Sequence, residues 1–421
     1  MSPRCRGVMV LDASHERTRA DAAGRVRSPG SRGSGRSDGR RRRGRRFRRA
    51  HPRARLAGCS ESRRTHGHRD PTRPGPHQAD AEASAELDAY AALIRRLDLE
   101  RLGTDELARP VTELVRQFAD DPYRAHVPLG AFDGDALVGI AELEWERDDQ
   151  ARTAYLEMLG VVPERRREGI GSALLERAER IARDAGRPTL VLAADHPADA
   201  GSDGDEVLHA PQGDATIPAG DPPARFAVAR GYALGQLDRV SVLDAAARAD
   251  EFRSRLDGLA ASARYRVRTW VDHAPDDLLD SLAVAHERMS VDAPSGAIDY
   301  ELERWDADRV RDDERRTAAM GRTTLTAAAV APDDTVAGFT VLSLPAGSPA
   351  VEQWDTIVLA AHRGHRLGMR LKLENLVLLE ATDATRERVY TWNADENEHM
   401  LAINIDLGFR PFALESVWQR P

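Results

Sequence analysis

The fold of this chain is decided by residues 161–171, which read Val161-Val162-Pro163-Glu164-Arg165-Arg166-Arg167-Glu168-Gly169-Ile170-Gly171. The apolar stretch before them predicts a strand over 151–162, and the helical spacing after them predicts a helix over 169–185. A strand that enters a helix through such a loop presents unpaired backbone N–H groups at the positive end of the helix dipole. Pyrophosphate is the ligand that this arrangement favours.

The residue types in the loop also suit a phosphate ligand. Gly169 and Gly171 let the backbone approach a phosphate without a Cβ in the way. Arg166 and Arg167 can add charge-assisted hydrogen bonds. A dinucleotide-binding fingerprint would need a third glycine at position 174, where the chain has Leu174. An ordinary strand-to-helix turn is the remaining alternative.

The same junction returns 197 residues later. Val358-Leu359-Ala360-Ala361-His362-Arg363-Gly364-His365-Arg366-Leu367-Gly368 aligns with the first loop without a gap. Predicted strands over 323–330, 336–344 and 351–359 precede it, and a predicted helix over 368–380 follows. A repeat of this length corresponds to one domain plus a linker.

Composition divides the 421-residue chain into four parts. Residues 1–82 are rich in Arg, Gly, Ser and Pro and poor in branched apolar side chains, which predicts a disordered tail. We expect a first domain over 83–245, a linker over 246–263 and a second domain over 264–421. The opening strand of the first domain should lie just before Leu87, but that stretch shows no strand pattern.

Charge separates the tail from the remainder. Residues 1–80 hold 22 Arg against 7 Asp and Glu, so this region carries +15 and the remainder carries −23 of the net −8. A body this acidic repels phosphate backbones, so nucleic-acid binding is expected only through the tail. It should attract cationic amines instead.

Cysteine and lysine usage excludes several chemistries. Both cysteines, Cys5 and Cys59, lie in the tail, which leaves the folded region without a thiolate nucleophile or a zinc–sulfur site. Lys372 is the single lysine, so the chain has no Walker A motif and lysine chemistry is disfavoured. No apolar run approaches a membrane span and no secretion signal is evident, so we expect a cytoplasmic protein that binds no membrane.

The pattern V-x-P-x-x-R-x-x-G-x-G at residues 161–171 resembles the acetyl-CoA pyrophosphate loop of the GNAT superfamily. The resemblance extends over about residues 83–421. It implies an α/β protein with two tandem GNAT folds, each a mixed, splayed β-sheet flanked by helices. The second loop departs from the family by placing Arg366 where the first glycine is usual.

The resemblance also implies which residues bind acetyl-CoA. They are Val161, Val162, Arg166, Arg167, Glu168, Gly169, Ile170, Gly171 and Ser172 in the first half, and Val358, Leu359, Arg363, Gly364, His365, Arg366, Leu367, Gly368, Met369, Asn393 and Asn397 in the second. Asn397 fits the family position that contacts the pantetheine arm, and helix capping is the alternative role for this residue. The first half has an Ala- and Arg-containing helix at the equivalent place, residues 224–232, without these asparagines.

Catalytic groups are less evident. Family resemblance implies a backbone oxyanion donor near Val162 or Leu359. Glu157 and Asp355 lie on the corresponding strands, but the alignment places them one residue apart, so strict alternation predicts that at most one faces its cleft. We favour Asp355 as the group that removes the amine proton.

The proton donor for the departing thiolate is also open. The tyrosine that many GNAT enzymes use is replaced by Ala227 and Asn404, so water or another tyrosine such as Tyr300 would have to serve. His362 and His365 flank the second loop, but no third ligand is in view, and we expect no metal.

These features predict an acetyl-CoA-dependent N-acetyltransferase that acts on the amine of a small molecule, with catalysis in the second half. Two alternatives stay open. One is a CoA-responsive binding or regulatory protein with a degenerate catalytic site, and the other is an enzyme that acetylates proteins or peptides.

Overall fold

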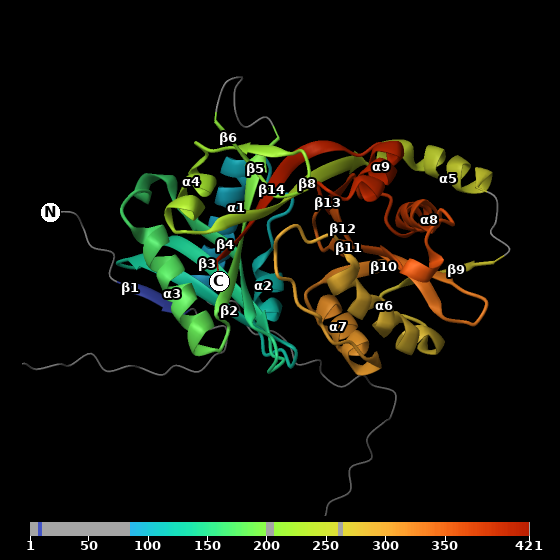
Figure 1. Cartoon of the computed structure of the whole chain (residues 1–421), viewed down its shortest axis with the longest axis horizontal. Helices are drawn as coiled ribbons and strands as arrows, with labels where there is room; N and C mark the ends of the chain where they lie inside the picture. The colour runs from blue at the N-terminus through green and yellow to red at the C-terminus, as the bar shows by residue number, and fades with distance from the viewer. Residues whose placement is uncertain (1–6, 11–84, 199–205, 260–263, 421) are drawn as a thin grey trace, which may run out of the picture. The chain divides into compact units, whose positions relative to one another are not determined.

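The computed structural model describes residues 7–10, 85–198, 206–259 and 264–420, with the elements labelled in Figure 1. The strands are β1 (Gly7–Val10), β2 (Arg124–Asp133), β3 (Ala136–Glu146), β4 (Thr153–Val161), β5 (Thr189–Pro197), β6 (Val207–His209), β7 (Thr216–Pro218), β8 (Ala233–Asp244), β9 (Arg266–Val271), β10 (Arg322–Val330), β11 (Val336–Pro345), β12 (Ala350–Val358), β13 (Arg388–Ala394) and β14 (Arg410–Arg420). The helices are α1 (Ala85–Leu102), α2 (Val111–Gln117), α3 (Ile170–Asp184), α4 (Pro222–Ala229), α5 (Ala249–Gly258), α6 (Leu279–Asp292), α7 (Ala307–Ala319), α8 (Leu367–Thr382) and α9 (Glu398–Leu407).

The element order confirms the predicted mixed α/β fold. The strand and helix expected around the first loop are β4 and α3, and those around the second loop are β12 and α8. None of the helices in the described residues is long and apolar enough to cross a membrane.

The opening strand of the first half is β1, in the Arg-rich tail. It pairs antiparallel with β2, with Gly7 opposite Phe132 and Val10 opposite Leu129. The sequence predicted no strand here because four residues are too short for a period-two pattern to stand out beside so many arginines. The tail residues 11–82 lie outside the described residues.

One 12-stranded sheet runs through the described residues in the order β1-β2-β3-β4-β5-β14-β8-β13-β12-β11-β10-β9. The last strand of each half therefore joins the other half: β14 pairs with β5, and β8 pairs with β13. The strands β14 and β8 also pair with each other. This exchange makes the sheet continuous.

Both halves contain the same divergence between two parallel strands. β4 and β5 pair only over Thr153–Leu156, and β12 and β13 pair only over Ala350–Gln353. Just beyond these pairs each central strand carries a bulge, at Glu157 against β3 and at Trp354 and Asp355 against β11. The strands separate at equivalent positions of the repeat, and each half gains a V-shaped opening.

Helices cover both faces of the sheet. In the second half, Phe339 and Val341 of β11 pack in a core with α6 and α7. Leu342 and Leu344 pack in a core with α8. Neighbouring residues of a strand point to opposite faces, so α6 and α7 lie on one face and α8 on the other.

The predicted linker, residues 246–263, forms a 3₁₀ turn, η2 (Ala246–Arg248), followed by α5. Phe252 of α5 is 1% exposed and packs in the core with α8. Arg248 donates to the carbonyl of Leu407 at the end of α9. This segment is therefore packed onto the second half over its described length.

Strand exchange predicts that neither half folds alone. Residues 1–245 would lack β14 and residues 246–421 would lack β8, so each fragment would expose an unpaired strand edge. We expect each fragment to aggregate when expressed separately and the two to form a soluble 1:1 complex when co-expressed. Size-exclusion chromatography measures this, and a folded, monodisperse single fragment would contradict the exchange.

Candidate functional site

The two predicted phosphate loops have the same backbone path. Each begins with a short 3₁₀ turn, η1 (Pro163–Arg165) or η4 (Ala360–His362), and an extended arginine with φ of −67°. Two left-handed positions follow, occupied by Arg167 and Gly169 in the first loop (φ 66° and 89°). In the second loop Gly364 and Arg366 occupy them (φ 82° and 56°).

Glycine and arginine have thus changed places between the two left-handed positions. The departure at Arg366 leaves the loop shape intact, since the same φ region is reached there as at Gly169. A non-glycine residue in this region costs about 1–2 kcal/mol. Each loop holds one such residue, which indicates that the loop shape is retained against local strain.

Both loops present free backbone donors at the start of a helix. Within the described part of the chain, the N–H groups of residues 167–172 and 364–369 donate no hydrogen bond. Ile170, Leu367 and Met369 have buried side chains, so only their backbone faces the loop. A row of such N–H groups with the helix dipole behind it is an anion-binding site.

The leading arginines differ in their partners. Arg166 and Arg363 each donate from Nε to a strand-end carbonyl at 3.0 Å, that of Val161 or Val358. Arg166 also forms a two-pronged ion pair with Glu100 of α1, at 2.8 and 2.6 Å. Among the described residues Arg363 has no carboxylate partner.

The other predicted loop residues have mainly structural contacts. Glu168 accepts from Arg165 at 3.0 Å, and Ser172 accepts from Arg230. His365 packs against Tyr265, whose hydroxyl lies 3.1 Å from Nδ1 of His362. The two histidines therefore surround a tyrosine.

The expected oxyanion donors are not free, which corrects the prediction. The N–H of Val162 donates to Val138 at 3.1 Å, and that of Leu359 donates to Ala337 at 2.9 Å. Both groups belong to the strand ladder. The bulges at Glu157 and Trp354 interrupt that ladder upstream, and a bulge leaves a residue without its regular partner.

The predicted asparagines lie together near the start of α9. The side chain of Asn397 accepts from the N–H of Met400 at 3.2 Å, so the residue caps the helix. Asn393 accepts from Asn404 at 2.5 Å. Asn404, at the position of the missing tyrosine, is buried.

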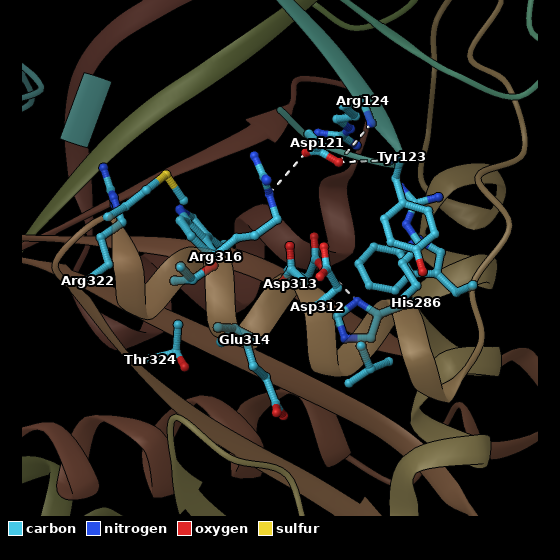
Figure 2. A pocket seen from close by; sticks show the side chains of 18 of the residues that line it. Asp121, Tyr123, Arg124, His286, Asp312, Asp313, Glu314, Arg316, Arg322 and Thr324 are labelled. Carbon is cyan, nitrogen blue, oxygen red and sulfur yellow. Dashed lines mark hydrogen bonds and ion pairs between the residues drawn. The ribbon is translucent and has the colours of Figure 1, made fainter. Parts of the chain in front are cut away.

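Asp355 lines a cavity of about 580 Å³ (Figure 2). The cavity lies between residues of α2, β2 and β3 and residues of α6, α7 and β10–β12. Oδ2 of Asp355 lies 3.5 Å from Nδ1 of His286, and the His286 ring stacks on Trp305 with centroids 4.5 Å apart. His286 was not predicted from the sequence, because nothing in its helix pattern links it to a strand 69 residues later.

This cavity holds charges of both signs. Arg316 pairs with Asp121 at 3.1 Å, as Figure 2 shows. In the same view Asp312 and Asp313 of α7 lie beside His286. Burial raises the pKa of Asp313, although His286 acts in the opposite direction.

Glu157 lines a second cavity, of about 250 Å³, together with Tyr155 and Tyr300. The rings of Tyr155 and Tyr300 are stacked, with centroids 6.3 Å apart. Desolvation and the nearby carboxylates of Glu144 and Glu142 raise the pKa of Glu157 to about 8. The described residues provide no ion-pair partner for this carboxylate.

Glu157 and Asp355 thus both line cavities, contrary to the expectation from strict alternation. Each lies at a bulge, where the strand has one residue more than its neighbour and the extra residue has no regular partner. The side chains there leave the strict alternation between the two faces of the sheet. Tyr300 lies in the same cavity as Glu157, and desolvation raises the pKa of its hydroxyl.

Three side chains of the types that bind metal ions lie close together. His126, Glu142 and Glu144 bring their ligand atoms within 4.8 Å of one another. Glu142 already accepts from Arg109 at 3.0 Å and from Gln117 at 2.9 Å. These bonds occupy the carboxylate that a metal would need.

Comparison with known proteins agrees with this geometry. The family model described as Acetyltransferase (GNAT) family matches residues 92–202, which include the first loop and Glu157. A solved tandem GNAT protein from the clavulanic acid biosynthesis pathway, without acetyl-CoA, is 27% identical, with a TM-score of 0.62 over 80% of this chain and 96% of that one.

A second structure supports the fold alone. The GCN5-related N-acetyltransferase from Sphaerobacter thermophilus is 15% identical, with a TM-score of 0.51 over 80% of this chain and 92% of that one. The comparison with curated proteins gives no match. The repeated loops, the paired splays and these likenesses identify a tandem GNAT fold whose residues 92–202 match the GNAT acetyltransferase family model.

Proposed function

We propose that this chain transfers an acetyl group from acetyl-CoA to the amine of a small molecule, and that Glu157 removes the amine proton. Membership of the GNAT family supports acyl transfer in general. The observation that carries the finer proposal is the unpaired Glu157 carboxylate at the bulge of β4, beside the splay and next to a cavity.

The loop donors fit the pyrophosphate of acetyl-CoA. In the first half these are the N–H groups of residues 167–172, and in the second half those of residues 364–369. Acetyl-CoA supplies the activated thioester when bound. The chain positions it and leaves the acceptor side of the splay open to the amine.

Proton removal favours Glu157 over Asp355. A general base works best when its pKa lies near the operating pH. Glu157 meets this condition with a pKa of about 8. Asp355 has an oxygen 3.5 Å from His286 and stays the candidate base of the second half.

The sequence favoured catalysis in the second half. Support for the first half comes from the family match at residues 92–202 and from the free carboxylate of Glu157. The ion pair between Arg166 and Glu100 places a negative charge near the first loop, which opposes pyrophosphate binding there and supports a working site in the second half. Substitutions that disable one half at a time can show in which half acetyl-CoA binds and reacts.

A carboxylate placed inside each loop tests acetyl-CoA binding. A Cβ at Gly171 meets no atom closer than 3.6 Å, and at Gly368 the nearest atom is the Ile403 terminal methyl at 3.2 Å, which must shift by a few tenths of an ångström. We expect Gly171→Glu to weaken acetyl-CoA binding on the order of a hundredfold by charge repulsion. Calorimetric titration measures this, with Gly171→Ala as the uncharged control.

The result for Gly368→Glu shows which half holds the working acetyl-CoA site. Unchanged affinity in this variant places the working site in the first half, whereas loss of affinity in this variant alone places it in the second. Undetectable acetyl-CoA binding by the unmodified chain would refute the acetyltransferase proposal altogether.

Replacing the proposed base tests the chemistry. We expect Glu157→Gln to lower kcat by about 10²–10⁴-fold and to leave acetyl-CoA affinity unchanged, because general-base catalysis contributes a factor of this size. In the unmodified enzyme kcat/KM should rise with pH and level off above about 8, as the Glu157 carboxyl loses its proton. Steady-state rates from pH 6 to 9.5 provide the profile.

Asp355→Asn is the matched control, because it removes the carboxylate at the bulge of β12 in the second half. If Glu157 is the base, the kcat/KM of the Asp355→Asn variant still rises with pH as in the unmodified enzyme. If Asp355→Asn removes activity and Glu157→Gln does not, catalysis lies in the second half.

A further inference from the structure

Three carboxylates form a row across the middle of the sheet. Glu415 of β14 lies directly opposite Asp195 of β5 on one side and Asp238 of β8 on the other. Residues paired in this way point to the same face of a sheet. Adjacent strands are about 4.8 Å apart, so the carboxylate row Asp195–Glu415–Asp238 is about 10 Å long.

None of the described cationic side chains forms an ion pair with the carboxylate row, although Arg101, which donates to the backbone carbonyl of Asp195 at 2.7 Å, and His196 both act to lower the pKa of Asp195. Within the described ranges, no ion pair or side-chain hydrogen bond engages any of its three carboxylates, although arginines neutralise other buried acids such as Glu113 and Glu142. The internal segments outside those ranges, 199–205 and 260–263, contain no Lys or Arg in their sequence. These two internal segments therefore supply no Lys or Arg to the row, and the arginines of residues 11–84 lie outside the described residues.

Buried acceptor atoms at one end of the row also lack partners. Oδ1 of Asp238 and Oε2 of Glu396 are both buried, and no described residue donates a hydrogen bond to either. Desolvation and the charges of Glu396 and Asp395 raise the pKa of Asp238 to about 7. Burial without a partner is costly for such atoms, and a bound donor would relieve it.

The other end of the row reaches the proposed site of chemistry. Asp195 lies on β5 beyond its last residue paired with β4, and Glu157 lies on β4 just beyond the same splay. The Tyr300 ring, stacked on Tyr155, adds an aromatic face close enough for Asp238 and Glu415 to raise the pKa of its hydroxyl. Aromatic faces and carboxylates together suit alkylammonium groups.

We propose that the carboxylate row binds the distal ammonium groups of the acceptor, so that the first half acetylates a linear diamine or polyamine whose reacting amine lies at Glu157. This inference rests on the proposed function. The row length suits a flexible chain with charges spaced along it better than a single ammonium.

The transfer balances without any further reactant. The N–C bond of the new amide forms as the C–S bond of the thioester breaks, and the amine proton passes to Glu157. The CoA thiolate leaves and takes a proton from water.

Calorimetric titration of the full-length chain tests the proposal with three probes: butylamine, 1,4-diaminobutane and spermidine. We expect spermidine to bind most tightly and butylamine most weakly. Glu415→Gln and Asp238→Asn should each weaken spermidine binding on the order of tenfold or more, since each removes a charge-assisted hydrogen bond. Asp334→Asn, which alters an exposed acid paired with Arg266 on another part of the chain, is the matched control and should bind spermidine normally.

Thermal unfolding shows whether the variants fold. At high pH, where the carboxyls of the row are ionised, removing one charge from a row of like charges should raise the melting temperature of Glu415→Gln and Asp238→Asn in the absence of ligand. Weaker spermidine binding by a variant with a raised melting temperature supports the row as a ligand site.

Two outcomes would overturn the inference. One is equal affinity for butylamine and spermidine, and the other is unchanged spermidine affinity in both row variants. Tight binding of Mg²⁺ or Ca²⁺ that excludes spermidine would also overturn it, because the row would then be a metal site.

Failure of the proposed function has a different signature. In that case spermidine would bind in a row-dependent manner but acetyl-CoA would not bind, and no amine would be acetylated. If acetyl-CoA binds and butylamine is acetylated as efficiently as spermidine, the function stands and the polyamine inference fails.

Discussion

The hydrogen bonding of β14 along both of its edges is the constraint on which the remainder of the structure depends. One edge pairs with β5 of the first half and the other pairs with β8, which in turn pairs with β13 of the second half. Without β14 the two half-sheets have no continuous connection, and the carboxylates of the row are not brought together. The strand exchange thus builds the proposed acceptor side of the first half from residues of both halves.

The two halves share a scaffold but differ in their interiors. Lys372 and Asn375 are buried in the second half, where the repeat alignment places the buried apolar residues Leu175 and Ala178 in the first. Burial lowers the pKa of Lys372 to about 7, so this single lysine is held in an environment that disfavours its charge. The cavity of mixed charge is lined by residues of both halves. Such divergence is consistent with different roles for the two halves.

Local features of the fold were predictable from the sequence because they leave local signals. The two loops, their strands and helices and the tandem order follow from a repeated motif and from apolar periodicity. The strand exchange was not predictable, since β14 has the same pattern whichever strand it pairs with. The carboxylate row was missed for the same reason: Asp195, Asp238 and Glu415 come from three distant segments and meet only through register.

Bulges explain the remaining differences. Period-two reasoning placed Glu157 and Asp355 on opposite faces, but an inserted residue shifts the alternation, and single-sequence patterns do not mark where insertion occurs. The free N–H groups of the loops were correctly expected, because glycine and arginine residues directly before a helix are a local signal in the sequence. The oxyanion donors were misplaced because ladder pairing of Val162 and Leu359 depends on neighbouring strands.

A structure of the full-length chain with acetyl-CoA bound is the most direct test of the central claim, that acetyl transfer takes place in the first half. We expect pyrophosphate oxygens on the N–H groups of residues 167–172 and the thioester in the splay between β4 and β5, within one water of Glu157. Acetyl-CoA bound at residues 364–369 alone, with its thioester between β12 and β13, would contradict it.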